Sequence, residues 1–214
     1  LAHEIKNPVG GLRGAAQLLE RELQDATLRE YTGVIIGEAD RLTALVDSMV
    51  GPNRAPVKND LNVHEVCEHV YHLLRGEAKS AVLVERDYDP SLPSALLDRH
   101  QIIQALLNVG RNALQAVGER ARIILRTRAV SNISIGTARY KLVASLQVED
   151  NGPGVPEELR GSIFYPLVTG RPNGTGLGLA VAQELVTRNG GLIEFESQPG
   201  RTIFTLLLPL GEAS

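Results

Sequence analysis

The sequence lacks the features that mark secreted, membrane-spanning and nucleic-acid-binding proteins. Its single cysteine, Cys67, cannot form an internal disulfide, which excludes the disulfide scaffolds of small secreted proteins. No apolar run approaches the roughly 20 residues that cross a bilayer, and no signal peptide opens the chain. The 22 basic and 25 acidic residues give a formal net charge of −3, so no overall basic field attracts nucleic acid or anionic membranes. We therefore expect a cytoplasmic protein whose partners are neither nucleic acid nor membrane.

What the chain does contain is typical of a globular protein. Its 214 residues suffice for one large domain or two small ones, and 43% of them are hydrophobic while 22% are charged. This balance argues against disorder and against a structure made of coiled coil alone. Because the sequence starts at Leu1 inside a predicted helix, we expect it to be a fragment of a longer protein.

Residues 1–51 predict two helices joined by a short polar turn. Asp25 or Thr27 in that turn can cap the second helix. Apolar residues recur at steps of three and four, which places them on one face of each helix: Ile5, Val9, Leu12, Ala16, Leu19 and Leu23 in the first, and Tyr31, Val34, Ile35, Leu42, Leu45 and Met49 in the second. One hairpin buries too little to be stable alone. We expect it to dimerise into a four-helix bundle, or else to pack on the rest of the chain.

The prolines and glycine of residues 51–56 interrupt the helical pattern, and we interpret residues 52–60 as a linker. Residues 61–210 then read as a mixed domain. The patterns predict helices over 62–77, 98–117 and 177–189, and strands over 82–88, 123–127, 140–149, 192–197 and 202–208, with a variable connection around Gly136. This order predicts an α+β fold, a two-layer sandwich with helices on one face of a mixed sheet.

Two asparagines and an arginine form the first cluster with chemical potential. Asn108 and Asn112 are four residues apart in the predicted helix 98–117, so both side chains project from one face, with Arg111 beside them. Mg²⁺ keeps several waters and takes few protein oxygens, so one amide oxygen together with phosphate oxygens is a suitable shell. By itself, the pattern also fits surface amides on an amphipathic helix.

The second cluster, Asp150, Gly152 and Gly154, follows a predicted strand directly. A carboxylate at a strand end can accept a hydrogen bond from an exocyclic amine such as that of adenine, and the glycines let backbone approach the ring. The same residues can simply form a turn.

Two further clusters follow. The apolar stretch Phe164–Thr169 can anchor a loop over a ligand, or pin that loop to the core. Gly174, Gly176 and Gly178 open the predicted helix 177–189, where free backbone N–H groups can hold phosphate, and Arg171 lies three residues earlier. Each cluster alone is a weak signal, but the four in this order predict a nucleotide site.

These clusters resemble the asparagine box, first glycine box, phenylalanine box and second glycine box of sensor histidine kinases. Residues 98–209 are similar to the Bergerat-type ATP-binding domain that these kinases share with DNA gyrase, the large heat-shock chaperone and the MutL repair protein. The opening stretch His3-Glu4-Ile5-Lys6-Asn7-Pro8 resembles the kinase phosphoacceptor box. Over nearly the whole chain, the likeness is to the nitrogen-regulation branch of these kinases.

The resemblance implies a role for each matching residue. It makes His3 the phosphorylated residue, Asn112 the magnesium ligand, Asp150 the adenine ligand, and the segment from Val155 to Asn173 a lid over ATP. The complete set of residues expected at the nucleotide is Asn108, Arg111, Asn112, Asp150, Gly152, Gly154, Thr169, Arg171, Gly174, Thr175, Gly176, Leu177 and Gly178.

One position separates a kinase from an ATPase. Gyrase-like relatives carry a glutamate four residues before the metal-binding asparagine as the base toward water, whereas this chain has Asn108, whose amide cannot take a proton. A different nucleophile is then needed. Neutral imidazole is competent, and the adjacent Glu4 can orient the ring of His3. Asn7, one helical turn further, is expected to orient a water for the reverse, phosphatase reaction.

The resemblance also implies partners and a reaction. We expect a homodimer that autophosphorylates from Mg-ATP and passes the phosphoryl group to an aspartate in the receiver domain of an NtrC-like response regulator, with a PII-type signal protein as a further partner. Two alternatives remain open from the sequence: an ATPase of the gyrase/MutL type, and a catalytically silent dimeric scaffold that docks a partner.

Overall fold

The computed structural model describes residues 2–50, 55–118, 121–171 and 174–211, without the side chains of residues 2–6, 26, 41 and 44–50. The chain divides into two compact units, Leu1–Arg54 and Ala55–Ser214. Within the described residues, no helix is long and apolar enough to cross a membrane.

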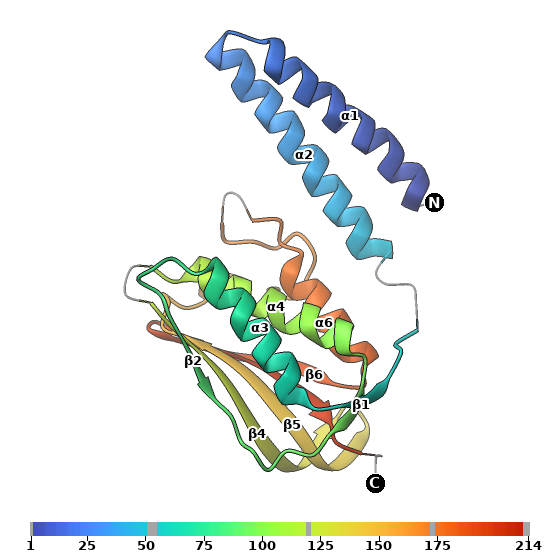
Figure 1. Cartoon of the computed structure of the whole chain (residues 1–214), viewed down its shortest axis with the longest axis vertical. Coiled ribbons are helices and arrows are strands. Elements are labelled where there is room, and N and C mark those ends of the chain that lie inside the picture. The colour runs from blue at the N-terminus through green and yellow to red at the C-terminus, as the bar shows by residue number, and fades with distance from the viewer. Residues whose placement is uncertain (1, 51–54, 119–120, 172–173, 212–214) are drawn as a thin grey trace. The chain divides into compact units, whose positions relative to one another are not determined.

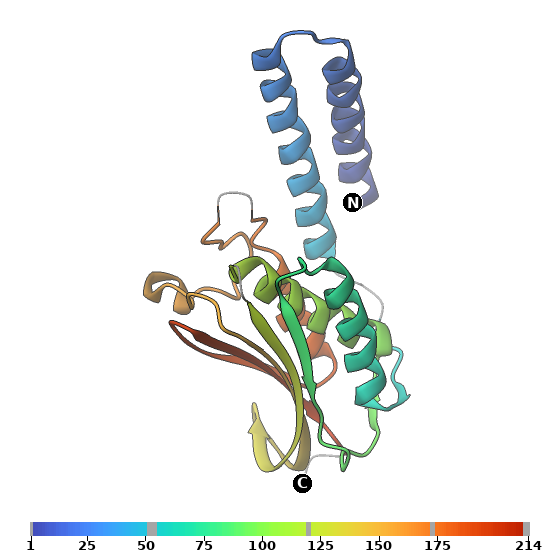
Figure 2. The same cartoon turned by 60° about the vertical axis from the view of Figure 1, so that its left-hand side comes forward.

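The first unit is an antiparallel helical hairpin, as the sequence predicts. Helix α1 spans Ala2–Glu22 and α2 spans Ala26–Val50, and the two lie side by side in Figures 1 and 2. Of the two expected capping residues, Asp25 is the one that caps α2, because its Oδ1 accepts the backbone N–H of Thr27 at 2.7 Å. An ion pair of 2.6 Å between Arg13 and Asp40 joins the helices.

The hairpin buries small side chains and leaves large ones exposed. Val9, Ala16 and Ala39 are buried between the helices. Most described members of the predicted apolar faces are exposed, with Leu12 at 62% and Tyr31 at 61%. The exposed set, which we call the hairpin stripe, is Leu12, Leu19, Tyr31, Val34, Ile35 and Leu42. Ile5, Leu45 and Met49 belong to the predicted faces, but their side chains lie outside the described residues.

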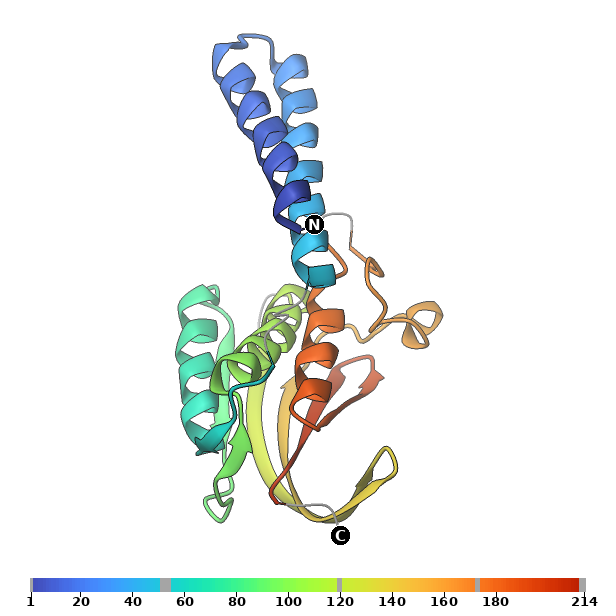
Figure 3. The same cartoon turned by 90° about the vertical axis from the view of Figure 1, so that its right-hand side faces the viewer.

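The second unit confirms the predicted two-layer sandwich. Its five-stranded sheet has the order β2-β4-β5-β7-β6, in which β2 runs parallel to β4 and the other pairs are antiparallel. The strands are β2 (Leu83–Asp87), β4 (Arg122–Ile135), β5 (Ala138–Asp150), β6 (Leu192–Gln198) and β7 (Arg201–Pro209). Helices α3 (Val63–Glu77), α4 (Arg99–Ala116) and α6 (Gly178–Arg188) cover one face of this sheet (Figures 1 and 3).

The core lies between the sheet and these helices. Leu106 of α4, Leu146 of β5 and Phe204 of β7 are almost fully buried there, and each such side chain contributes about 1.5–3 kcal/mol through removal from water. Helix α4 is capped at its N-terminus, because the Oδ1 atom of Asp98 accepts the backbone N–H groups of His100 and Gln101. This places the asparagine-bearing face of α4 at a fixed position over the sheet.

Three features differ from the sequence prediction. The connection around Gly136 is a tight turn, because residues 128–135 continue β4 and pair with β5 in one long hairpin. The predicted linker, residues 52–60, extends too far: Asn59 and Asp60 belong to a short strand, β1 (Asn59–Leu61), that pairs with β3 (Ala95–Leu97). Residues 52–54 of that region lie outside the described residues. A short helix, α5 (Glu157–Arg160), was also not predicted.

Candidate active site

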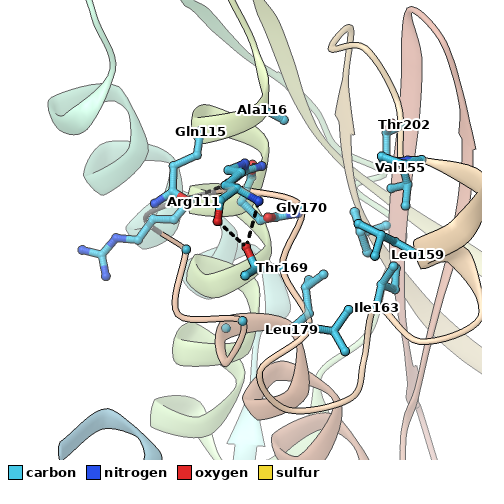
Figure 4. A pocket seen from close by; sticks show the side chains of 18 of the residues that line it. Arg111, Gln115, Ala116, Val155, Leu159, Ile163, Thr169, Gly170, Leu179 and Thr202 are labelled. Carbon is cyan, nitrogen blue, oxygen red and sulfur yellow. Dashed lines mark hydrogen bonds between the residues drawn. The ribbon is translucent and has the colours of Figure 1, made fainter. Parts of the chain in front are cut away.

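The second unit contains a cavity of about 520 Å³ between α4, the end of the sheet and the segment that precedes α6 (Figure 4). We call residues 155–173 the lid segment; residues 172 and 173, and so Asn173, lie outside the described residues. The lining includes Asn108, Arg111, Asn112, Gln115 and Ala116 of α4; Asp150, Pro153 and Gly154 after β5; Val155, Pro156, Leu159, Ile163, Val168, Thr169, Gly170 and Arg171 of the lid segment; Gly174, Thr175, Gly176, Gly178 and Leu179 at the start of α6; and Thr202 and Phe204 of β7.

The fold thus brings the four sequence clusters to one cavity. Of the residues expected at a nucleotide, all line it except Gly152 and Leu177, which are buried beside it. The phosphoacceptor box lies in the other unit, on the N-terminal part of α1, where Asn7 is exposed and the side chains of His3 and Glu4 lie outside the described residues.

Asp150 is the buried acceptor of the cavity. It is the last residue of β5, is 4% exposed, and its Oδ1 accepts the backbone N–H of Gly152 at 2.9 Å. Burial raises the pKa of this carboxyl, and the Gly152 N–H and the charge of Arg171 oppose that rise. A carboxylate held in this way presents an acceptor to a donor on a ligand.

The two glycines after Asp150 are required by close contacts. A Cβ atom at Gly152 would lie 2.7 Å from Oδ1 of Asp150, so any side chain there would displace the carboxylate. Gly154 has φ +87°, and its Cβ would lie 3.0 Å from the backbone carbon of Gln198. Glycine is therefore the only residue that fits either position without rearrangement.

The asparagines and arginine of α4 have different partners. The side-chain amide of Asn108 donates to the carbonyl of Gly178 at 3.2 Å and so ties α4 to the start of α6. Among the described residues, no hydrogen bond holds the side-chain amide of Asn112, which faces the cavity free to bind a ligand. Arg111 lines the cavity as expected, and its guanidinium forms an ion pair with Glu77 of α3, with an Nε–Oε2 distance of 2.9 Å. Its charge is therefore already partly neutralised.

The start of α6 leaves backbone donors without a side-chain cap. Its N-cap residue, Leu177, makes no side-chain capping bond to the N–H groups of the first turn. The preceding loop is closed by Gly176, whose carbonyl accepts the N–H of Leu167 at 3.0 Å and whose Cβ would lie 2.5 Å from the Leu167 carbonyl carbon. With φ +66°, this position favours glycine. The N–H of Leu177 donates to Oγ1 of Thr175 at 3.4 Å, and the turn as a whole lies at the positive end of a helix dipole.

Arg171 supplies a positive charge from the lid segment. Its guanidinium donates to Oε1 of Gln115 at 2.7 Å and to the carbonyl of Asn112 at 3.1 Å. Burial lowers the pKa of Arg171, and the nearby Asp150 opposes that shift. The side chain of Thr169 accepts the N–H of Arg171, which fixes the backbone around this residue.

Because three of its residues lie in the expected lid, sequence reasoning missed only part of one wall of the cavity. Val155, Leu159, Ile163 and Thr202 form it, opposite Gln115 and Ala116 of α4 in Figure 4. The three apolar residues of this wall, Val155, Leu159 and Ile163, belong to no sequence motif that indicates a binding role. Thr202 was open to prediction, because pairing the strand that ends near Asp150 with the strand that starts at Thr202 places the two residues opposite each other.

The described residues contain no group of three or more His, Cys, Asp or Glu that could hold a metal ion. A cation in this cavity would therefore need oxygen ligands from the substrate as well as from the protein. Asn112, with its unengaged amide oxygen, fits a hard cation such as Mg²⁺ as a single protein ligand.

This fold and cavity agree with the matches to known families. The model of histidine kinase-, DNA gyrase B-, and HSP90-like ATPases matches residues 97–212, and the chain belongs to that family. The model of the His Kinase A (phospho-acceptor) domain matches residues 1–54. Among individual proteins, the chain is 51% identical over 212 residues to the sensory histidine kinase/phosphatase NtrB of Vibrio alginolyticus, covering 98% of this chain and 61% of that protein. The chain thus spans about three fifths of the length of the curated relatives it matches.

Solved structures of histidine kinases share the architecture. Full-length ShkA in complex with AMPPNP superposes with a TM-score of 0.70 at 25% identity, covering 100% of this chain and 46% of ShkA. The histidine kinase ThkA in complex with the response regulator protein TrrA gives a TM-score of 0.68 at 26% identity, covering 98% of this chain and 60% of that chain.

Proposed function

We propose that this chain is the phosphotransfer core of a nitrogen-regulation sensory histidine kinase. Residues 1–51 form the dimerisation and phosphoacceptor hairpin and residues 61–210 form the ATP-binding domain. The protein moves the γ-phosphoryl group of Mg-ATP to His3 and then to an aspartate of a response regulator. The NtrB relatives and the two family matches support this proposal.

One observation carries the proposal: four clusters that lie far apart in the sequence line a single cavity around the buried carboxylate of Asp150. In our proposal, Asp150 accepts the exocyclic amine of adenine, while Gly152 and Gly154 leave room for the ring. Phe164 anchors the lid segment to the sheet, since its ring contacts Phe195 and Phe204 edge-on at centroid distances of 6.0 and 6.3 Å.

The opposite end of the cavity suits the triphosphate. Backbone N–H groups at the start of α6 can hold phosphate oxygens, helped by Thr169 and the charge of Arg171. Asn112 would hold Mg²⁺, which neutralises phosphate charge when bound. Arg111 is already paired with Glu77, so we assign it a weaker role, and Asn108 and Leu177 shape the α4–α6 contact rather than bind phosphate.

The cavity favours a kinase over a hydrolase. Asp150 is the only carboxylate among the described lining residues, and its Oδ1 is engaged by the Gly152 N–H. No general base stands at position 108, so water lacks an activator and an external nucleophile is needed. In our proposal that nucleophile is the imidazole of His3, oriented by Glu4. Asn7, exposed one turn along α1, positions water in the phosphatase reaction.

The exposed hairpin stripe supports a homodimer. Two stripes facing each other would form a four-helix bundle and remove these large side chains from water. The response-regulator partner is inferred from the NtrB relatives and from the ThkA–TrrA complex. An NtrC-like identity for that regulator, a PII-type signal protein as a further partner, and a cytoplasmic location stay predictions from the resemblance.

The test is incubation of the chain with Mg²⁺ and ATP labelled on the γ-phosphate. We expect label on the protein that survives base and is lost in acid, which is the behaviour of phosphohistidine. His3→Gln should abolish labelling and leave ATP binding intact, and Asp150→Asn should weaken both. Phosphate release by the His3→Gln chain at the wild-type rate would instead support an ATPase. Failure of the wild type to bind ATP would support a silent scaffold.

A further inference from the structure

Three polar side chains form a row across the end of the sheet that borders the cavity. The strand register pairs Asp150 of β5 with Thr202 of β7, and Thr202 with Ser197 of β6. Directly paired residues project from the same face of a sheet, so all three side chains are on the helix-covered side. Asp150 and Thr202 line the cavity and are each 4% exposed, whereas Ser197 lies behind them, half-buried.

Ser197 makes two contacts at once. Its Oγ accepts the backbone N–H of Val155 at 2.8 Å, and it lies 2.9 Å from the hydroxyl oxygen of Thr202. Val155 is the first residue of the lid segment, and Figure 4 shows it next to Thr202 on the sheet side of the cavity. One hydroxyl therefore connects the root of the lid segment to a residue that lines the cavity.

A second hydrogen bond, which does not involve Ser197, also holds the chain near the root of the lid segment. The role of Ser197 can therefore be tested separately. The N–H of Gly200 in the β6–β7 turn donates to the carbonyl of Gly152 at 2.8 Å. Because both groups belong to the backbone, this bond holds the turn independently of any side chain. The bond through Ser197 depends on a side chain that also contacts Thr202 of the cavity lining, so a substitution there can separate the two attachments.

Counting hydrogens indicates the direction of the hydroxyl row. The Val155 N–H can only donate, so Ser197 Oγ accepts it and retains one hydrogen. If Ser197 gives that hydrogen to Thr202, every polar group of Ser197 is used, and the hydrogen of Thr202 is left to donate into the cavity. In the opposite direction the hydrogen of Ser197 would have no acceptor in any contact of the described structure.

We propose that Ser197 is a positioning residue for nucleotide recognition: it holds the lid root through Val155 and turns the Thr202 hydroxyl into a donor beside the Asp150 acceptor. The inference rests on the proposed function. It adds a residue outside the cavity lining that contributes to the choice between adenine and guanine.

The chemistry of the two bases explains that choice. Adenine presents an amine donor next to a ring-nitrogen acceptor, which matches a carboxylate acceptor beside a hydroxyl donor. Guanine presents an oxygen acceptor and a ring N–H donor at the same two positions, so both contacts would be mismatched. A site with fixed polar groups rejects such an analogue because its buried groups are left unpaired.

The experiment measures ADP and GDP binding to the full chain by calorimetry, and hydrogen exchange at the Val155 amide. Ser197→Ala should weaken ADP binding about fivefold, the typical worth of one hydrogen bond, and change GDP binding by less than about twofold. The Val155 amide should exchange faster. Ser197→Thr keeps the hydroxyl and should restore ADP binding. Thr205→Val, on the opposite face of β7, is the matched control and should change neither affinity.

The outcomes separate the two proposals. If the wild type prefers ADP and Ser197→Ala keeps that preference and the slow Val155 exchange, the inference is wrong while the proposed function stands. If the wild type binds neither nucleotide, the proposed function fails and takes the inference with it. If Ser197→Ala does not fold, the wild type decides: ADP must slow exchange at Val155 more than GDP does, and equal protection overturns the inference.

Discussion

The two units of this chain differ in what each can enclose alone. The sandwich buries its own large side chains, such as Leu146 and Phe204, between sheet and helices. The hairpin buries Val9, Ala16 and Ala39 and leaves its largest apolar residues in water. The periodic pattern looks alike in both units. The difference teaches that periodicity identifies an apolar face, and that only the structure tells whether the same chain covers it.

The largest expected effect is on dimerisation, which in our account involves the hairpin alone. Ile35→Asp places a charge on the hairpin stripe, where dimerisation would bury it unpaired, and should weaken the dimer about 100-fold or more. Sedimentation equilibrium measures the change, and ADP binding by the sandwich should be unaffected. Gln24→Asp, in the exposed turn between the helices, is the control. An unchanged dimer in Ile35→Asp would mean that the stripe is not the interface.

The second prediction compares one leucine from each unit. Leu146→Ala empties a fully buried site and should cost the sandwich about 2–5 kcal/mol at any protein concentration. Leu12→Ala removes a side chain that is 62% exposed, so its cost should appear only when dimers form and should grow with concentration. Urea unfolding at several protein concentrations separates the two. A concentration-independent loss of several kcal/mol for Leu12→Ala would contradict the contrast.

The third prediction breaks the nucleotide site without touching the hairpin. Asp150→Asn keeps the shape but loses the charged acceptor, and should weaken ADP binding about 10- to 100-fold. Calorimetry measures the affinity, and sedimentation should give the wild-type dimer.

Acid sharpens this prediction. Burial raises the pKa of Asp150, so the carboxyl takes up a proton at a higher pH than an exposed aspartate does. Protonation removes the acceptor, and the ADP affinity of the wild type should fall on acidification through that raised pKa. The ADP affinity of Asp150→Asn should not show this fall. If the affinity of both proteins falls in parallel as the pH is lowered, another group is responsible.

The last comparison is of two helix caps, one from each unit, and it includes the smallest expected effect. Asp98→Ala removes a buried carboxylate that accepts the N–H groups of Val57, His100 and Gln101, and should cost about 2–3 kcal/mol. Asp25→Ala removes an exposed cap of α2 and should cost about 0.5–1 kcal/mol. Hydrogen exchange at the first turn of each helix reports the loss. Equal costs would mean that burial adds nothing to the cap.

Short-range patterns predicted much of the sandwich. The helical period of residues 98–117 and the strand patterns of residues 192–197 and 202–208 gave elements close to those observed. Most residues expected at a nucleotide also line the cavity, because each glycine or asparagine cluster is local in the sequence.

Long-range pairing explains what was missed. Strands β1 and β3 are three residues each and exist only through their pairing, and the extension of β4 depends on its register with β5. Arg111 and Glu77 are 34 residues apart, so no local pattern reveals that this arginine is already bound. Ser197 was missed for the same reason, since its partners Val155 and Thr202 belong to other elements.

The most direct test of the central claim is to locate the phosphoryl group by mass spectrometry at neutral pH after incubation with Mg-ATP. We predict a single phosphoryl group on the peptide that contains His3, absent when ADP replaces ATP. Release of inorganic phosphate with no modified peptide, or a phosphoryl group on any other residue, would contradict the account.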